Sequence, residues 1–308
     1  MNNNQSVLVT TELSLPLFIR GKVRDTYDLG NHLLIIATDR VSAFDSVLPC
    51  GIPNKGLVLN QLSFFWFRQT ADLMPNHLVE AVNDVHCLDT YIPAENRFLY
   101  PSYLTERSMV VKKVKRIPIE CVVRGYLAGS AWAEYQEHST ISGFHLRKGL
   151  QESQELPEPL FTPTTKAETG HDQPITVDEM REIVGESIAS EIKEKSLALY
   201  NYAREYARKR GIIIADTKME FGLDNDQLIL IDELFTPDSS RIWDAALYRV
   251  GQPQPSYDKQ PLRDWLVQSG WNKEPPAPML SPEVVEATAR RYEQAYERLT
   301  GRKIVSTI

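Results

Sequence analysis

Short apolar runs and helical periodicities alternate along the first half of the chain. If residues 22–29 are extended, Val23, Asp25 and Tyr27 share one face; Gly30-Asn31 then predicts a turn, and residues 33–38 (LLIIAT) are an apolar run of strand length, so we expect a β-hairpin. Residues 57–73 carry apolar side chains at helical spacing, which predicts a helix with a buried face. Residues 108–114 and 119–124 predict two more strands, and their short connection suggests a second hairpin.

The second half begins with a polar stretch and continues with helices. Residues 139–175 are rich in Ser, Thr, Pro, Glu and Gly, which is typical of a long loop or an insertion. A Thr176-x-x-Glu179 capping box then opens a helical pattern that we expect to run unbroken to Gly211. Two further helices are expected within 258–270 and 281–301, so the fold class is mixed α and β.

Composition places the chain among ordinary soluble proteins. Its 308 residues carry 34 Lys and Arg against 41 Asp and Glu, a net charge of -7. This acidic balance argues against nucleic-acid binding, which needs basic surfaces. It still permits a local basic cluster that binds a small anion.

Three further features predict a reduced, cytoplasmic protein. The three cysteines form no paired motif, so we interpret them as free thiols. No apolar run approaches the roughly 20 residues of a membrane span, and the first residues lack a secretory signal pattern.

The most informative segment for chemistry is 212–233. If 212–221 is a strand, Asp216, Lys218 and Glu220 share one face, and the turn after it brings a second strand back to Asp232-Glu233. Either Asp232 or Glu233 can join that face. Clustered carboxylates repel, and a magnesium ion with phosphate oxygens would resolve the repulsion. A solvated sheet face with weak salt bridges is the alternative, but the polar loop that follows favours a functional site.

Basic residues mark other candidate anion sites. Arg124 ends a predicted strand and Ser130 begins a helical stretch after two glycines, which suits a monophosphate; an ordinary strand-to-helix loop is the alternative. The cluster from Lys112 to Arg116 is either a solvated tip or a polyphosphate attractor. Because no G-x-G-x-x-G or P-loop motif is present, a nucleotide site must be built differently, for instance by residues 20–25 folding over it.

Together these segments resemble the SAICAR synthetase family of purine biosynthesis. The matching segments are GKVRDTYDLG (21–30), ATDRVSAFD (37–45), IPNKGLVLNQLSFFWF (52–67), ECVVRGYLAGSAW (120–132), PTTKAETGHD (163–172), DTKMEFGL (216–223) and DELFTPDSSRIWD (232–244). They occur in order over most of the chain and indicate the longer form of the family.

The resemblance implies a fold and a reaction. The fold is α+β and two-lobed, with an antiparallel N-terminal sheet, a larger α/β C-terminal lobe, ATP in the cleft and extra C-terminal helices. The reaction is an ATP-dependent, Mg²⁺-assisted ligation of L-aspartate to the carboxylate of carboxyaminoimidazole ribonucleotide (CAIR). The products are SAICAR, ADP and phosphate, by way of an acyl phosphate.

The resemblance also implies residue roles. For ATP it implies a phosphate flap around Lys22 and Arg24 and an adenine hinge at Lys112, Lys113 and Val114. It implies Glu220 and Asp232 as magnesium ligands, and it implies that Asp216 and Lys218 lie near the ribose or the reacting carboxylate. It implies that Arg124, Ser130 and Arg241 bind the CAIR 5′-phosphate and that Ser42 lies near the imidazole carboxylate. Lys166, His171 and Asp172 are implied on the aspartate and γ-phosphate side.

The expected organisation has three parts: an ATP-binding lobe (1–115), a catalytic lobe (116–250) and a C-terminal helical segment (251–308). We expect a monomer. Two other functions remain open from the residues alone. One is a small-molecule kinase of related fold, resembling inositol-phosphate kinases; the other is a nucleotide-binding protein without catalysis.

Overall fold

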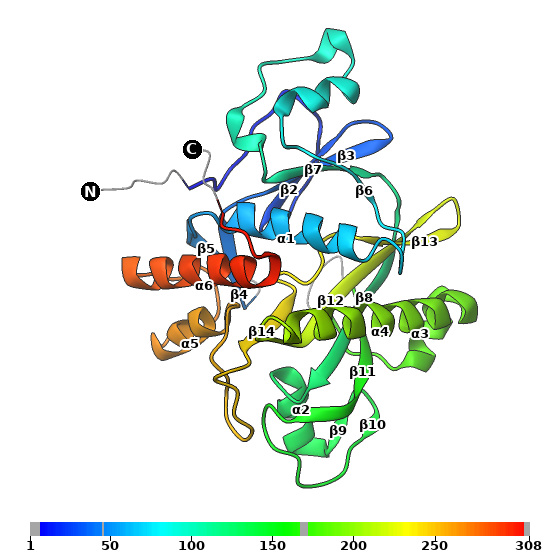
Figure 1. The fold of residues 1–308 in the computed structure, drawn as a ribbon, viewed down its shortest axis with the longest axis vertical. Coiled ribbons are helices and arrows are strands. Elements are labelled where there is room, and N and C mark those ends of the chain that lie inside the picture. Colours follow the sequence, from blue (N-terminus) through cyan, green and yellow to red (C-terminus); the bar gives the residue numbers. More distant parts are fainter. Residues whose placement is uncertain (1–6, 45, 167–171, 305–308) are drawn as a thin grey trace. The chain divides into compact units, whose positions relative to one another are not determined.

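The computed structural model describes residues 7–44, 46–166 and 172–304. The chain divides into two compact units, coloured along the sequence in Figure 1. The first unit spans Met1–Phe67, His77–Lys113 and Tyr257–Ile308, and the second spans Arg68–Asn76 and Val114–Ser256. The C-terminal helices therefore belong to the same unit as the N-terminal strands.

An antiparallel sheet organises the first unit. Its strand order is β1–β2–β3–β7–β6, with bounds Leu17–Arg20, Arg24–Asp28, His32–Ala37, Ser108–Lys112 and Leu78–Ala81. The expected hairpin of residues 22–38 is confirmed as β2 and β3. Helix α1 (Lys55–Gln69) confirms the helix expected at 57–73, but it begins two residues earlier and ends four residues earlier. The short 3-10 helices η1 (Val85–Thr90), η2 (Ala94–Asn96) and η3 (Ser102–Leu104) follow β6 in the chain.

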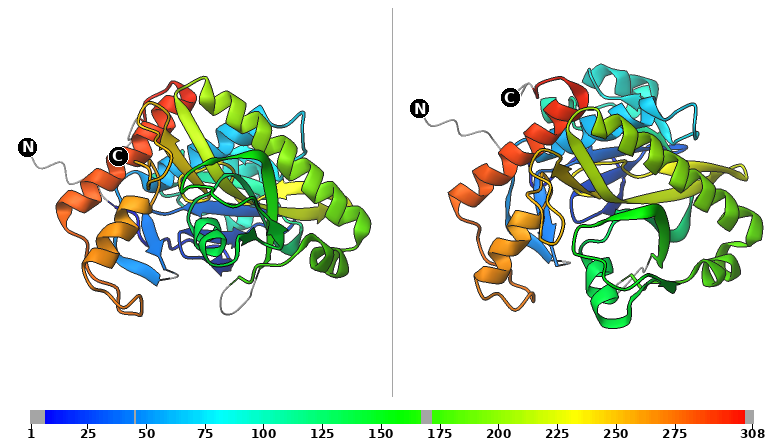
Figure 2. Two further views of the ribbon diagram at one scale, coloured as in Figure 1. Left: turned by 90° about the horizontal axis from the view of Figure 1, so that it is seen from below. Right: turned by 60° about the horizontal axis from the view of Figure 1, so that its bottom comes forward.

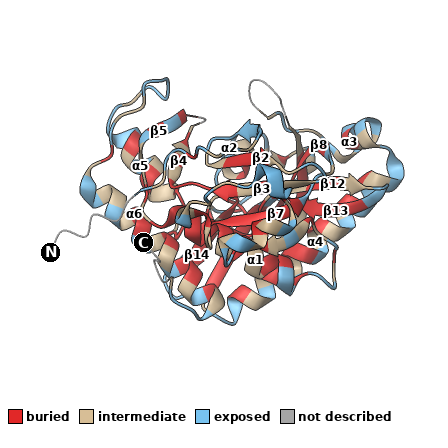
Figure 3. Ribbon diagram, turned by 90° about the horizontal axis from the view of Figure 1, so that it is seen from above, coloured by how far each residue is buried: buried red, intermediate tan, exposed pale blue. Residues whose placement is uncertain are grey.

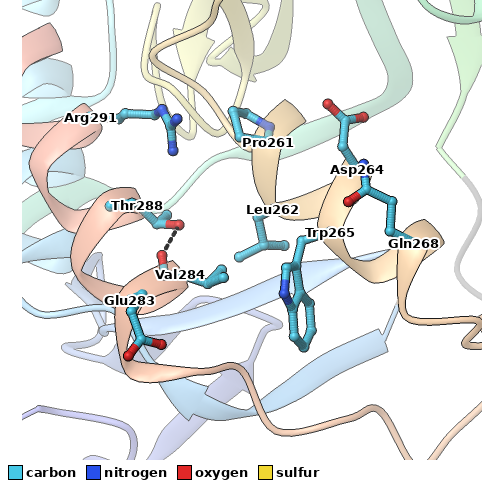
Figure 4. A pocket seen from close by; sticks show the side chains of 10 residues that line it. Pro261, Leu262, Asp264, Trp265, Gln268, Glu283, Val284, Thr288 and Arg291 are labelled. Atoms are coloured by element: carbon cyan, nitrogen blue, oxygen red, sulfur yellow. Dashed lines mark hydrogen bonds between the residues drawn. The ribbon is translucent and has the colours of Figure 1, made fainter.

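A separate hairpin in this unit packs on the C-terminal helices. In the described part of the chain, strands β4 (Arg40–Ala43) and β5 (Ser46–Gly51) form a sheet of two strands, and a two-stranded hairpin is marginal alone. Their apolar side chains share a buried cluster with helices α5 (Gln260–Gln268) and α6 (Pro282–Thr300). A pocket of roughly 350 Å³ is lined by residues of α5 and α6 (Figure 4), and the Thr288 hydroxyl there donates to the Val284 carbonyl at 2.7 Å.

The second unit is built on a twisted sheet of five strands. The order is β11–β8–β12–β13, and β14 also pairs with β12. The bounds are Glu155–Thr165 for β11, Lys115–Tyr126 for β8, Ile212–Asp224 for β12, Gln227–Ile231 for β13 and Ser240–Asp244 for β14. Strands β8 and β12 are the two central strands, so each has a neighbouring strand on both sides.

Helix α4 (Glu186–Arg208) covers one face of this sheet, as Figures 1 and 2 show. The Tyr200 hydroxyl of α4 donates to the Ile214 carbonyl at 2.7 Å, and a Cβ at Gly125 of β8 would lie only 2.0 Å from that hydroxyl. Gly125 and Arg124 are neighbours on β8, so their side chains point to opposite faces. The face that carries Arg124 is therefore not the one covered by α4. Figure 3 shows buried residues on one side of α4 and exposed residues on the other.

The remaining elements of this unit follow β8 in the chain. They are α2 (Ser130–His138), the short pair β9 (Thr140–Ile141) and β10 (Phe144–His145), and α3 (Val177–Val184).

Three expectations about secondary structure were wrong. Residues 108–112 and 115–126 do not form a hairpin: β7 pairs with β3 and β6, while β8 pairs with β11 and β12. Residues 139–175 are not one long loop, because they contain β9, β10 and the eleven-residue strand β11. The helix expected from Thr176 to Gly211 is divided into α3 and α4 at Gly185, whose φ of 84° is left-handed and favours glycine.

Two expected absences concern the described part of the chain. The three cysteines are free thiols there. Within the same ranges, no helix has both the length and the apolar character needed to cross a membrane.

Candidate active site

The charged residues expected at 212–221 do share one face of β12. The hairpin with β13 is confirmed, with Glu220 opposite Ile231. On its other side β12 pairs with β8, so that Asp216 lies opposite Arg124 and Glu220 lies opposite Glu120. The face consequently carries two charge clusters, four residues apart along β12, or about 13 Å.

The first cluster consists of Arg124, Asp216 and Arg241, which we call the arginine cluster. Asp216 pairs in register with Arg124 of β8 and with Arg241 of β14. Its Oδ2 accepts a hydrogen bond from Arg241 Nη1 at 2.5 Å and lies 3.7 Å from Arg124 Nη1. Two guanidinium groups against one carboxylate leave a net positive charge.

Polar contacts hold Arg124 in place. Its Nε donates to Thr162 Oγ1 at 3.0 Å and its Nη2 donates to Ser130 Oγ at 3.3 Å. Burial lowers the pKa of Arg124 below its ordinary value, while Asp216 opposes that shift. The guanidinium is thus a desolvated donor, and a bound anion would gain more from it than from a solvated one.

Arg241 lies against the start of α2. A Cβ at Gly129 would come within 2.0 Å of Arg241 Nη2, and Gly129 has a left-handed φ of 58°. Only glycine meets both requirements, which explains the second glycine of the loop. Arg124, Arg241 and Ser130 at the first turn of α2 form a geometry suited to a phosphate.

A tightly bonded loop sets the position of Arg241. The Thr236 hydroxyl donates to the Glu233 carboxylate at 2.6 Å, and the Thr236 N–H donates to Ser239 Oγ at 3.1 Å. Ser240, the next residue, shares a 2.8 Å hydroxyl contact with Thr217 of β12. The Thr-Pro-Asp-Ser-Ser segment is therefore a rigid connection and not a solvated loop.

The second cluster consists of Glu120, Lys166, Lys218 and Glu220, which we call the lysine–glutamate cluster. Lys166 Nζ lies 2.7 Å from Glu220 Oε1 and 3.5 Å from Glu120 Oε1. Lys218 Nζ lies 2.7 Å from Glu120 Oε2. These bonds connect the end of β11 with β8 and β12, so three strands contribute to one group of charges.

The pKa shifts in this cluster reflect crowded charges. Burial and then the charge of Asp232 raise the pKa of Glu220, although Lys166 opposes the shift. Burial lowers the pKa of Lys166, but Glu220, Glu120 and Asp232 outweigh burial and leave that pKa above its ordinary value. Asp232 follows β13 with a left-handed φ of 68° and acts on both groups. The carboxylates are thus held close enough to repel one another, and a bound cation would reduce that electrostatic repulsion.

Comparison with known proteins decides the family. The sequence pattern described as SAICAR synthetase matches residues 17–278. The chain is 53% identical over 295 residues to the phosphoribosylaminoimidazole-succinocarboxamide synthase of Thermodesulfovibrio yellowstonii, covering 96% of this chain and 99% of that one. The chain belongs to the SAICAR synthetase family.

Two more relatives support this assignment. The phosphoribosylaminoimidazole-succinocarboxamide synthase of Elusimicrobium minutum is 48% identical, with 97% of this chain and 98% of that one covered. A SAICAR synthase structure from Saccharomyces cerevisiae, complexed with SAICAR, aligns with a TM-score of 0.87 at 44% identity, covering 96% of this chain and 99% of that one. The resemblance to the SAICAR synthetase family and the expected α+β fold are confirmed.

The other residues implied by the SAICAR synthetase resemblance are distributed over both units. Lys22 and Arg24 lie at the β1–β2 turn and the start of β2, and Ser42 lies half-buried on β4. Lys113 Nζ bonds Asp28 at 2.6 Å, so its charge is already engaged. These residues belong to the first unit.

The expected hinge and the aspartate-side residues complete the set. The chain passes from the first unit to the second between Lys113 and Val114, next to exposed Lys112. Asp172 is half-buried in the second unit, and His171 lies outside the described residues.

Sequence reasoning missed Glu120 and Thr162. Both lie beside charged groups named in advance, Glu120 against two lysines and Thr162 against Arg124. A signal for Glu120 was present: it precedes Arg124 by four residues in a predicted strand, which places both on one face.

Proposed function

We propose that this chain is an ATP-dependent ligase that joins L-aspartate to the carboxylate of CAIR and forms SAICAR, ADP and phosphate. The similarity to phosphoribosylaminoimidazole-succinocarboxamide synthases over nearly the full length of both chains carries this proposal. The two charge clusters on one sheet face support it, because the reaction needs a phosphate cradle and a charged reaction centre on one substrate.

The chemistry explains why such a face is needed. A carboxylate is a poor electrophile, so one of its oxygens first attacks the γ-phosphorus of ATP and ADP leaves. The aspartate nitrogen then attacks the acyl carbon, the C–O bond to phosphate breaks, and the nitrogen loses a proton. Both steps concentrate negative charge, so positioning and charge neutralisation supply most of the catalysis.

We assign the CAIR 5′-phosphate to the arginine cluster. Arg124 and Arg241 supply fixed guanidinium donors, Ser130 supplies a hydroxyl, and the start of α2 adds the positive end of a helix dipole. Asp216 orients Arg241 and balances part of its charge in the absence of an anion.

We assign the reacting groups to the lysine–glutamate cluster. Lys218 is half-exposed, with 52% of its side chain accessible, and can reach an anion on the open face. Lys166 lies deeper, beside Glu220, and neutralises charge there. We further propose that Lys166, His171 and Asp172 serve the aspartate and γ-phosphate side.

A magnesium ion fits Glu220 and Asp232. Burial and then the charge of Asp232 raise the pKa of Glu220, and paired oxygen donors are what Mg²⁺ prefers. Phosphate oxygens would complete the coordination, because Mg²⁺ is usually bound by one or two carboxylates together with substrate phosphates. Bound there, Mg²⁺ would offset charge on the transferring phosphoryl group.

We assign ATP binding to residues of the first unit and its exit. Lys22 and Arg24 would contact the phosphates, and Lys112 to Val114 would meet the adenine. Ser42 would lie near the imidazole carboxylate. The monomeric state stays a prediction, which sedimentation equilibrium would test.

The deciding experiment measures ADP release by the purified chain with ATP, Mg²⁺ and CAIR, with and without L-aspartate. We expect ADP formation that depends on aspartate, together with the ultraviolet change of the imidazole product. ATP binding without turnover on CAIR would contradict the proposal and favour a kinase of another substrate or a nucleotide-binding protein.

A further inference from the structure

Glu120 is a buried acid placed directly opposite another acid. It lies on the central strand β8 with 6% of its surface exposed, in register with Glu220 of β12. Like charges directly opposite each other on neighbouring strands destabilise a sheet. A buried carboxylate in this position therefore needs partners that compensate its charge.

The compensation comes from the two lysines. Glu120 Oε2 accepts from Lys218 Nζ at 2.7 Å, and Oε1 lies 3.5 Å from Lys166 Nζ. Lys166 belongs to the end of β11 and Lys218 to β12, on either side of β8. Among the described residues, Glu120 is the carboxylate that contacts both the Lys166 and the Lys218 ammonium groups. Lys166 also pairs with Glu220, whereas the ion pair of Lys218 is with Glu120.

The two ends of the Glu120–Lys218 bond differ in freedom. Glu120 is fixed, because only 8% of its side chain is exposed and strands flank it on both sides. Lys218 has a flexible four-carbon stem and a side chain that is 52% exposed. A charge-assisted hydrogen bond to a fixed acceptor removes most of the freedom of that stem.

We infer that Glu120 is a positioning residue that holds the Lys218 ammonium over the reaction centre. This inference rests on the proposed function and names a role that Glu120 performs through Lys218 and not on the substrate. Glu120 lies about 13 Å along the sheet from the arginine cluster, a separation of four residues on β8. Its loss should leave binding of the CAIR phosphate unaffected.

The test is a double-mutant cycle in the full-length chain. Glu120→Gln keeps an acceptor but removes the charge, and we expect kcat to fall by about a hundred-fold, as for a misplaced catalytic group. The KM for CAIR should stay within about two-fold, because the arginine cluster is untouched. In a Lys218→Met background the same Glu120→Gln change should cost little further, since the group it positions is already gone.

Controls separate this role from structure alone. Glu155→Gln removes a 2.6 Å ion pair to Arg208 from β11 of the same sheet and should leave kcat and KM unchanged. Glu120→Asp retains the charge on a shorter stem and should give an intermediate kcat, which also serves if the Gln variant fails to fold.

Two results would overturn the inference. One is a Glu120 effect of full size in the Lys218→Met background, and the other is an equal loss in the CAIR affinity measured by calorimetry. The wild-type chain is assayed first for aspartate-dependent ADP release. If it shows none, the proposed function fails, whereas activity with an additive cycle rejects the positioning role alone.

Discussion

The two charge clusters lie on one sheet face yet are built in different ways. The arginine cluster has an excess of fixed cations, because the Thr162 and Ser130 hydroxyls hold Arg124 and the Asp216 carboxylate holds Arg241. The lysine–glutamate cluster combines flexible ammonium groups with Glu220, whose pKa is raised by burial and then by neighbouring carboxylates. We infer that the arginine cluster suits an anionic group whose charge stays constant, and that the lysine–glutamate cluster suits charge that changes during a reaction.

This difference follows from the side chains. A guanidinium is planar and stays charged, so it can be oriented once and left in place. An ammonium on a long stem and a carboxylate of raised pKa respond to a nearby charge by moving or by exchanging protons. The following predictions test whether binding and chemistry divide between the clusters in this way.

The largest effect is expected from the two acids that we propose as magnesium ligands. Glu220→Gln or Asp232→Asn should reduce kcat to below about one-thousandth, because the transferring phosphoryl group loses its charge compensation. ADP release measures the rate, and circular dichroism checks that the fold is retained. The exposed Glu158→Gln on β11 is the control. Near-wild-type activity in both variants would reject the metal assignment.

The next effect concerns CAIR binding. Arg241→Ala should raise the KM for CAIR about 10- to 100-fold, since charge-assisted hydrogen bonds contribute about 1.5–3 kcal/mol. The kcat at saturation should change much less. Arg241→Lys keeps the charge without the planar guanidinium, so its KM for CAIR should lie between those of wild type and Arg241→Ala. An unchanged KM for CAIR in the Ala variant would remove Arg241 from the phosphate site.

Sequence alone reached much of this face because local pattern determines it. Alternation on a strand placed Asp216, Lys218 and Glu220 together, and the short turn after β12 returned Asp232 to them. The caps of the C-terminal helix were equally local: Ser281 accepts from the Val284 N–H, and Gly301 ends α6 with a left-handed φ.

Pairing between distant segments was beyond the same reasoning. An apolar strand pattern says which side chains share a face but not which strand lies beside it, so β8 was assigned to a hairpin with β7. The Glu120–Glu220 register depends on the pairing of β8 with β12, which the sequence did not predict. The helix break at Gly185 was not predicted either, because the apolar spacing continues through both α3 and α4.

A smaller effect concerns stability and pH. Because the pKa of Glu220 is raised in the folded chain, the folded state binds more protons than the unfolded state as pH rises above the ordinary glutamate value. Its contribution to stability is therefore present at low pH and is lost as pH rises through the raised pKa. We expect Glu220→Gln to gain stability relative to wild type as pH rises above the ordinary glutamate value.

Urea midpoints in the presence of a metal chelator would measure this difference. The chelator is needed because a bound cation would compensate the same charge. Glu158→Gln should follow the wild-type pH profile throughout. A Glu220→Gln profile parallel to wild type would show that the crowded acids cost the fold nothing.

The smallest effect comes from two threonines that separate the clusters most finely. Thr162 and Thr164 lie two residues apart on one face of β11; Thr162 accepts from Arg124 Nε at 3.0 Å, and Thr164 lies 3.5 Å from Glu120. Removing one good hydrogen bond costs about 1 kcal/mol, so Thr162→Val should raise the KM for CAIR roughly five-fold. Thr164→Val loses only a long contact beside the other cluster and should leave that KM unchanged. Because the two substitutions are chemically identical, equal effects on CAIR binding would mean that the face works as one site and that the division between the clusters is wrong.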